Sequence, residues 1–271
     1  MGARSTTAIR ILAPSLSAEL GRDWARHWPR WFGPQRVVLP RAPEKEHLAL
    51  VETALGRVVA KREVPEGWKR SLSALRARPL RSLAAFRAAA ALLARGLETP
   101  EPLAVLETRG FGACEAVLVT RYVEGCGPWD FLQRGGGPER LAETLAHALA
   151  RLHAAGFRHR DLKASNLLLR EQESERLVLV WTDLEGLRHL GSIPPLFRAR
   201  DLARLSMSFQ SAQARAAGVR ADDWPGLVNI YLRATLGRDP SPAELGRFLE
   251  RTQRWAEGAI RRNLARGRPV L

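Results

Sequence analysis

The segment between His159 and Asp183 constrains the fold and the chemistry of this chain more than any other stretch. It begins with the octapeptide His159-Arg160-Asp161-Leu162-Lys163-Ala164-Ser165-Asn166. Two apolar runs follow, residues 167–169 and 177–181, and a polar loop separates them. Short apolar runs around a polar loop are typical of a β-hairpin. Such a hairpin would return Asp183 to the side of Asn166.

Asp161, Asn166 and Asp183 carry the groups that phosphoryl transfer needs. This reaction requires a base near the acceptor and neutralisation of the charge on the phosphate oxygens. The H-R-D-L-x-x-x-N spacing is that of the catalytic loop of protein kinases. We therefore predict Asp161 as the base, and Asn166 and Asp183 as Mg²⁺ ligands, because Mg²⁺ prefers hard oxygen donors. Lys163 follows Asp161 by two residues and is predicted to contact the γ-phosphate.

A lysine upstream completes the predicted phosphate-binding set. The chain contains four lysines, and Lys61 ends the β-branched run 57–61. This run resembles the V-A-I-K strand of kinases. We predict Lys61 on the third strand, in contact with the α- and β-phosphates of ATP. The alternative is a solvated lysine at the end of a strand, because a motif stays a hypothesis until its structural context is known.

Several stretches beyond the catalytic loop resemble the lipopolysaccharide kinases, which phosphorylate Kdo or heptose sugars of the inner core. In that family, as here, a segment like Thr182-Asp183-Leu184-Glu185 replaces the DFG of other kinases. The resemblance covers roughly residues 35 to 235. The other stretches that carry it are residues 96–104, 152–163 and 200–205.

The resemblance implies an α+β, protein-kinase-like bilobal fold. We expect a basic and aromatic segment over residues 1–35 and a nucleotide-binding N-lobe over residues 36–123. The N-lobe would be small and mainly antiparallel β, with one helix that Ser82 caps, that runs through Arg95 and that Gly96 ends. A mostly helical C-lobe with the catalytic loop would cover residues 124–271. Asp201 resembles the buried acid that holds the catalytic loop in place.

The resemblance also implies the activity. We expect an ATP- and Mg²⁺-dependent phosphotransferase that transfers the γ-phosphate to a sugar hydroxyl of the lipopolysaccharide inner core, on Kdo or heptose. One alternative is another small-molecule or protein kinase of this fold. No A-P-E follows Asp183, which argues against a long activation loop for peptide substrates. A second alternative is a pseudokinase that serves as a binding or scaffold protein.

Two departures from the kinase pattern motivate the pseudokinase alternative. Residues 40–47, between the first two expected strands, contain no glycine. No Asp or Glu occurs from Gly67 through Leu97, and Ala85 stands about where a kinase helix carries the Glu that pairs with the strand lysine.

The net charge of +15 favours polyanionic partners. These are a phosphorylated glycolipid such as lipopolysaccharide, an anionic membrane surface, or nucleic acid. An arginine-rich composition can also reflect a GC-rich coding sequence. No zinc-finger, helix-turn-helix or RNA-binding signature accompanies the charge, so a nucleic-acid partner is not expected.

The leading segment has the residue pattern of an amphipathic helix. Leu20, Trp24 and Trp28 recur at four-residue spacing, and three arginines repeat at the same interval on the other side. A basic helix with tryptophans opposite suits an interfacial membrane anchor. The alternative is a helix whose tryptophans pack on the N-lobe, as apolar helical stripes usually do.

Localisation follows from the remaining features. No run approaches the ~20 apolar residues of a membrane span, and the N-terminus lacks the apolar core of a signal peptide. Cys114 and Cys126 have no metal-binding spacing and are expected to be structural thiols of a reducing compartment. We expect a cytoplasmic protein with peripheral contact at the cytoplasmic face of the inner membrane.

Overall fold

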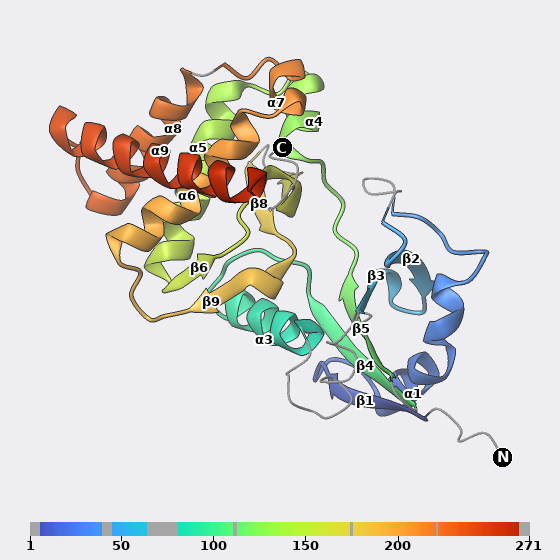
Figure 1. Ribbon diagram of the computed structural model, residues 1–271. Coiled ribbons are helices and arrows are strands. Elements are labelled where there is room, and N and C mark those ends of the chain that lie inside the picture. Colours follow the sequence, from blue (N-terminus) through green and yellow to red (C-terminus); the bar gives the residue numbers. More distant parts are fainter. Residues whose placement is uncertain are drawn as a thin grey trace. The chain divides into compact units, whose positions relative to one another are not determined.

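The chain folds into two compact units, Met1–Glu124 and Gly125–Leu271, in the computed structural model shown in Figure 1. The structure describes residues 6–39, 45–63, 81–110, 113–173, 176–220 and 222–265. Residues 40–44, part of the expected glycine-free loop, lie outside the described residues.

The first unit is built on a five-stranded sheet in which all strand pairs are antiparallel. The order of the strands is β1-β4-β5-β3-β2. Their bounds are Thr6–Leu12 for β1, Leu48–Thr53 for β2, Gly56–Glu63 for β3, Pro102–Gly110 for β4 and Ala113–Arg121 for β5.

One face of this sheet is covered by the leading segment. Helix α1 (Ala18–His27) and the 3₁₀ turn Trp28–Phe32 follow β1. Trp24 and Trp28 are only 3% and 2% exposed and pack against the sheet. The packing alternative for the amphipathic helix is therefore confirmed, because the tryptophan face lies in the core of this unit and is not available to a membrane.

The opposite face is covered by α3 (Arg81–Leu93), as Figure 1 shows. Phe86 of this helix packs with Val105 of β4. The expected helix is confirmed to within two residues at its C-terminal end. Gly96 has a φ of +65°, a left-handed conformation that glycine adopts without steric cost, and the chain leaves the helical path there.

The sequence analysis placed the first strand wrongly. Residues 36–39, just before the glycine-free loop, form no strand, and there Leu50 donates one backbone hydrogen bond to Val37 at 2.9 Å. The structure instead has the edge strand β1, which pairs with β4 and which we did not predict. Lys61 lies on the third strand in chain order, as expected.

The second unit is mostly helical. Its strands form two two-stranded sheets, β6 with β9 and β7 with β8. The helices are α4 (Pro128–Gln133), α5 (Pro138–Ala154), α6 (Pro195–Phe209), α7 (Ala212–Ala216), α8 (Asp223–Leu236) and α9 (Pro242–Leu264). The strands are β6 (Phe157–His159), β7 (Leu167–Glu171), β8 (Leu177–Trp181) and β9 (Leu187–His189).

Helix α5 leads into the candidate site. Its apolar face is buried, including Leu141, Leu145 and Leu149, and the helix packs on α8. Gly156 then ends it with a φ of +78°, and an added Cβ there would lie 2.5 Å from the carbonyl oxygen of Gly191. Only glycine fits this turn, so the chain enters β6 in a defined direction.

The start of the second unit is fixed to β7. Cys126 and Leu169 exchange two backbone hydrogen bonds of 3.0 and 2.8 Å. An added Cβ at Gly125 would lie 2.6 Å from the Leu169 carbonyl oxygen, so this approach also requires glycine. The Cys126 thiol is half-buried, and burial raises its pKa. The side chain of Cys114 lies outside the described part of the chain.

Within the described ranges, no helix is both long and apolar enough to cross a membrane.

Candidate active site

The β7–β8 hairpin returns Asp183 to the catalytic segment, as the sequence predicted. Leu167 faces Trp181 in the strand register. One residue beyond this pair, the N–H of Thr182 donates a hydrogen bond of 3.0 Å to the carbonyl oxygen of Asn166. Asp183 is therefore the next residue after Thr182, whose backbone is hydrogen-bonded to Asn166.

Asn166 is held by the loop that carries the predicted base. Its Nδ2 donates to the carbonyl oxygen of Asp161 at 2.9 Å, and the residue is 2% exposed. This hydrogen bond uses the amide nitrogen and not the side-chain oxygen Oδ1. Oδ1 is a neutral oxygen donor of the kind that Mg²⁺ accepts.

The Asp161 carboxylate lies between two cations. Lys163 Nζ is 3.3 Å from Oδ2, and Nη1 of Arg204 on α6 is 3.7 Å from Oδ1. The Asp161 side chain is 51% exposed, so a hydroxyl from solution can reach it. The sequence analysis predicted Lys163 and missed Arg204, whose only sequence signal was its place in the family-like stretch 200–205.

Asp183 has an unusual backbone conformation. Its φ of 54° and ψ of 55° are left-handed, and among the described residues it is the one non-glycine residue with positive φ. Such a conformation costs about 1–2 kcal/mol, and at a functional site it commonly serves to aim a side chain. The 3₁₀ turn that follows is tied back to the catalytic loop, because Arg160 donates its N–H to the Gly186 carbonyl oxygen at 3.1 Å.

Asp201 on α6 anchors the catalytic loop, which confirms the prediction for this residue. Its fully buried carboxylate accepts hydrogen bonds from the backbone N–H of His159 at 3.0 Å and from Nη2 of Arg158 at 2.9 Å. About two turns further along α6, the Ser208 Oγ accepts a hydrogen bond from the N–H of Ala164 at 3.1 Å. Helix α6 therefore supports the loop on both sides of Asp161.

The two buried histidines of this region have structural roles. His159 Nδ1 accepts from the backbone N–H of Asp161 at 3.3 Å, and His153 Nδ1 lies 2.8 Å from the Tyr231 hydroxyl. Burial lowers the pKa of both imidazoles, so both are held neutral. Burial also raises the pKa of Tyr231 to about 12, so its hydroxyl remains protonated.

The donor set fits Mg²⁺ bound together with a phosphate. Within the described residues, no group of three or more His, Cys, Asp or Glu side chains could hold a metal ion unaided. Asn166 and Asp183 offer hard oxygen atoms, and Mg²⁺ usually binds through one or two such side chains plus water and substrate phosphates. These two residues would hold the ion, and it would neutralise charge on the phosphate oxygens.

Lys61 belongs to the first unit, whereas the other four predicted site residues gather in the second. It faces Leu118 of β5 in the strand register. The position Ala85, where a kinase glutamate was expected on the following helix, is only 3% exposed and packed in the core. The helix therefore offers no carboxylate to Lys61 at this position.

A carboxylate on the lysine's own strand binds the helix instead. Glu63 lies two residues after Lys61 and therefore on the same face of β3. Its carboxylate accepts from the N–H groups of Arg81 and Ser82 at 3.2 and 2.9 Å, and from Ser82 Oγ at 2.8 Å. Glu63 thus caps the N-terminus of α3, a role that we had assigned to Ser82, and it couples β3 to the helix.

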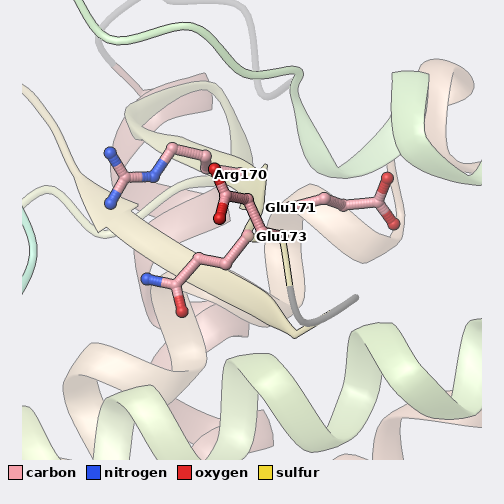
Figure 2. Close-up of a pocket in the computed structure, with 4 residues that line it drawn as sticks. Arg170, Glu171 and Glu173 are labelled. Carbon is pink, nitrogen blue, oxygen red and sulfur yellow. The ribbon is translucent and has the colours of Figure 1, made fainter.

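A hollow at the end of β7 is separate from these residues. It is lined by Arg170, Glu171, Gln172 and Glu173. Figure 2 shows that these side chains spread in different directions and do not converge on a common point. None of the five predicted site residues lines it, so we do not assign the reaction to this hollow.

Comparison with known proteins agrees with this geometry. The lipopolysaccharide kinase (Kdo/WaaP) family matches residues 51–231. The 3-deoxy-D-manno-octulosonic acid kinases of Xylella fastidiosa strains 9a5c and M12 are each 33% identical over 129 residues, which is 47% of this chain and 49% of each relative. The chain thus spans about half the length of the curated relatives it matches.

A solved structure, WaaP in complex with acyl carrier protein, resembles the fold over most of its length. It is 20% identical in sequence, with a TM-score of 0.55, and the match covers 93% of this chain and 98% of that chain. The protein therefore has the expected α+β, protein-kinase-like bilobal fold. Because the family match spans well over half of its residues, the chain belongs to the lipopolysaccharide kinase (Kdo/WaaP) family.

Proposed function

We propose that this protein transfers the γ-phosphate of ATP, with Mg²⁺, to a sugar hydroxyl of the lipopolysaccharide inner core. The observation that carries the proposal is the arrangement around the β7–β8 hairpin. There the exposed carboxylate of Asp161 is contacted by Lys163. The backbone carbonyl oxygen of Asp161 accepts a hydrogen bond from the Asn166 side chain. The Xylella relatives are named as kinases of 3-deoxy-D-manno-octulosonic acid, which is Kdo. Their names therefore favour Kdo over heptose as the acceptor.

In the proposed reaction, the acceptor hydroxyl donates a hydrogen bond to the Asp161 carboxylate. As its oxygen forms a bond to the γ-phosphorus, Asp161 takes the proton, and the bond from the γ-phosphorus to the bridging oxygen breaks. ADP leaves with that electron pair. Lys163 moves from Asp161 to the γ-phosphate, and Lys61 holds the α- and β-phosphates. Mg²⁺ held by Asn166 and Asp183 would stabilise the charge on the phosphate oxygens.

The missing helix glutamate still supports one alternative, a pseudokinase. Ala85 is buried, so that position offers no carboxylate for Lys61. We favour the active kinase because Glu63 couples β3 to α3 by three hydrogen bonds. These hydrogen bonds can hold β3, the strand that carries Lys61, against the helix. In other kinases the Lys–Glu pair has this role.

We further propose that the protein acts at the cytoplasmic face of the inner membrane, where a lipid-linked acceptor would be presented. The net charge of +15 supports peripheral attraction to an anionic surface. Because Trp24 of α1 and Trp28 of the following 3₁₀ turn are in the core, this attraction would be electrostatic and therefore weakened by salt.

The test is transfer of labelled γ-phosphate from Mg-ATP to purified, dephosphorylated lipopolysaccharide core. Asp161→Asn is compared with the matched control Asp222→Asn, which changes an exposed carboxylate in the same unit. Label should appear on the sugar with wild type and control, and fall by roughly 10²–10⁴-fold with Asp161→Asn. Mass spectrometry of the released sugar then identifies Kdo or heptose.

Two other outcomes would redirect the proposal. No transfer, together with Mg-ATP binding that depends on Lys61 and Asp183, would keep a kinase and reject this acceptor. Neither transfer nor nucleotide binding would favour the pseudokinase.

A further inference from the structure

The segment that joins β9 to α6, residues 188–196, exposes several apolar side chains. It runs along the margin of the second unit in Figure 1. Leu190 and Leu196 are each 48% exposed, and Pro194 and Pro195 between them are exposed as well. Exposed apolar residues are ordinary when they stand alone, but here four of them fall within the stretch 190–196 and form a patch.

Backbone contacts hold this β9–α6 segment in place. The N–H of Leu190 donates a hydrogen bond of 2.8 Å to the carbonyl oxygen of Gly156, and Gly191 approaches Gly156 so closely that no Cβ fits there. Ile193 is only 1% exposed, and its carbonyl oxygen accepts from Arg198 Nε at 2.8 Å. The segment is therefore fixed at both ends and in its middle. Its exposed leucines belong to a defined conformation.

Positive charge accompanies the apolar side chains. Residues 186–200 include three arginines and no Asp or Glu. Arg188 is exposed, and its Nη1 donates to the backbone carbonyl oxygens of Glu185 and Leu187 at 3.1 and 2.6 Å. Among the described residues, Arg188 forms no ion pair with a carboxylate, so its charge is available to an external anion.

The β9–α6 segment is also joined to the catalytic loop. Strand β9 pairs with β6, with His189 opposite Phe157, and β6 ends two residues before Asp161. The four residues from Phe157 to Asp161 span at most about 14 Å, and the Cα atoms of paired residues are about 5 Å apart. The proposed base therefore lies within about 20 Å of the exposed patch.

Apolar side chains beside an unpaired cation match the surface of an anionic bilayer. There, apolar groups enter the interface and arginines are attracted to the anionic headgroups. We propose that the β9–α6 segment docks this protein on an anionic lipid bilayer. Leu190, Leu196 and the two prolines enter the interfacial region, and Arg188 binds a lipid phosphate.

This inference rests on the proposed function, in which the acceptor is lipid-linked, and it names the surface that faces the lipid. The general attraction from the net charge is screened by salt. The leucines add an apolar contribution that this screening does not weaken. Docking through this segment keeps Asp161 close to the bilayer in which the acceptor is anchored.

The first test is binding of the full-length protein to vesicles of phosphatidylcholine with and without phosphatidylglycerol, measured by co-sedimentation. Wild type should prefer the vesicles with phosphatidylglycerol and retain part of its binding at about 1 M salt, where charges are strongly screened. Leu190→Ser and Leu196→Ser should each weaken binding by about 3–10-fold, and the double variant by about 10–100-fold, because less apolar surface leaves water. Leu236→Ser is the matched control, since this leucine of α8 is 43% exposed, and it should bind as wild type.

Arg188→Gln tests the contribution of the charge. It should weaken vesicle binding by about 5-fold at about 0.1 M salt and have no effect at about 1 M salt. Arg251→Gln removes an exposed charge from α9 and should have a smaller effect. An equal loss in the two variants would show that total charge drives the attraction, and would overturn the role of Arg188.

The second test compares two forms of the acceptor in the transfer assay. With lipopolysaccharide embedded in vesicles, the double leucine variant should raise the KM for the acceptor by about 10-fold or more, in proportion to its lost binding. With lipid-free core oligosaccharide, its kcat and KM should equal those of wild type. A loss with both acceptors would mean that the substitutions disturb the catalytic loop, and would overturn the docking role.

The outcomes separate this inference from the proposed function. Vesicle binding that depends on the two leucines, without transfer to any acceptor, would support the docking segment and reject the proposed function. Equal vesicle binding by wild type and the double variant would overturn the docking segment, whatever the transfer assay shows. A wild-type dimer that the double variant makes monomeric, with vesicle binding unchanged, would assign the patch to a contact between two copies of this chain and would also overturn it.

Discussion

The backbone N–H of His159 donates a hydrogen bond to the fully buried carboxylate of Asp201, and the two atoms are 3.0 Å apart. The second carboxylate oxygen accepts from Arg158 at 2.9 Å. One side chain on α6 thus fixes the residue two positions before the proposed base. The geometry of the catalytic loop therefore depends on the packing of a helix that follows it in sequence.

Replacing Asp201 should destabilise the protein strongly. Asp201→Ala leaves the guanidinium of Arg158 buried without its carboxylate, and breaking a buried pair in this way costs about 3–5 kcal/mol. Urea unfolding measures the loss. Asp239→Ala, which breaks an exposed ion pair with Arg233, should cost about 0–1 kcal/mol. Equal midpoints for the two variants would contradict the anchoring role.

Substitutions at Asp183 should separate backbone strain from metal binding. Asp183→Ala and Asp183→Gly should both lose phosphate transfer by about 100-fold or more, because a Mg²⁺ ligand is removed. The free energy of unfolding of Asp183→Gly should be about 1 kcal/mol higher than that of Asp183→Ala, since only glycine adopts the left-handed conformation without strain. The glycine variant should therefore unfold at a higher temperature. Transfer and thermal unfolding are measured on the same preparations. An Asp183→Ala variant as stable as the glycine variant would show that strain is negligible here.

Removing the Glu63 cap should weaken the first unit. Glu63→Ala deprives the α3 N-terminus of its hydrogen-bond acceptor and should cost about 1–2 kcal/mol in urea unfolding. Glu52→Ala, at an exposed position of β2, should change stability by less than about 0.5 kcal/mol.

Restoring a kinase-like glutamate at the buried position should not help. Ala85→Glu places a carboxylate in the core and should destabilise the protein without raising transfer. An increase in activity would mean that Glu63 does not replace the missing pair.

Stability should fall as the pH falls below about 7. Burial lowers the pKa of His153 and His159 in the folded state, whereas in the unfolded chain a histidine titrates near its ordinary value of about 6.5. Below that pH the unfolded chain binds more protons, so the free energy of unfolding decreases with a slope of up to about 2.7 kcal/mol per pH unit for the two groups. Urea unfolding at several pH values between about 5 and 8 measures it.

His153→Gln should reduce that slope by up to about half. His147→Gln, at an exposed position of the same helix, should leave it unchanged. A slope that does not respond to His153 would assign the pH dependence to other groups.

The sequence alone was enough to predict that a hairpin returns Asp183 to the side of Asn166. Asp161, Asn166 and Asp183 lie within one short segment, and strand pairing over a few residues brings them together without help from distant parts of the chain. The buried faces of α5 and the amphipathic α1 were also predictable, because apolar residues recur at helical spacing.

Only the tertiary structure decided what surrounds that segment. Asp201 is 42 residues beyond His159, and Glu63 meets α3 across 18 or 19 residues, so no local spacing announces either contact. β1 forms the edge of the sheet because it pairs with β4, a strand far along the chain. Local backbone geometry thus determined which candidate site residues of the second unit lie together. The packing of α6 against the loop, and of the sheet against its two helices, determined which side chains hold and flank them.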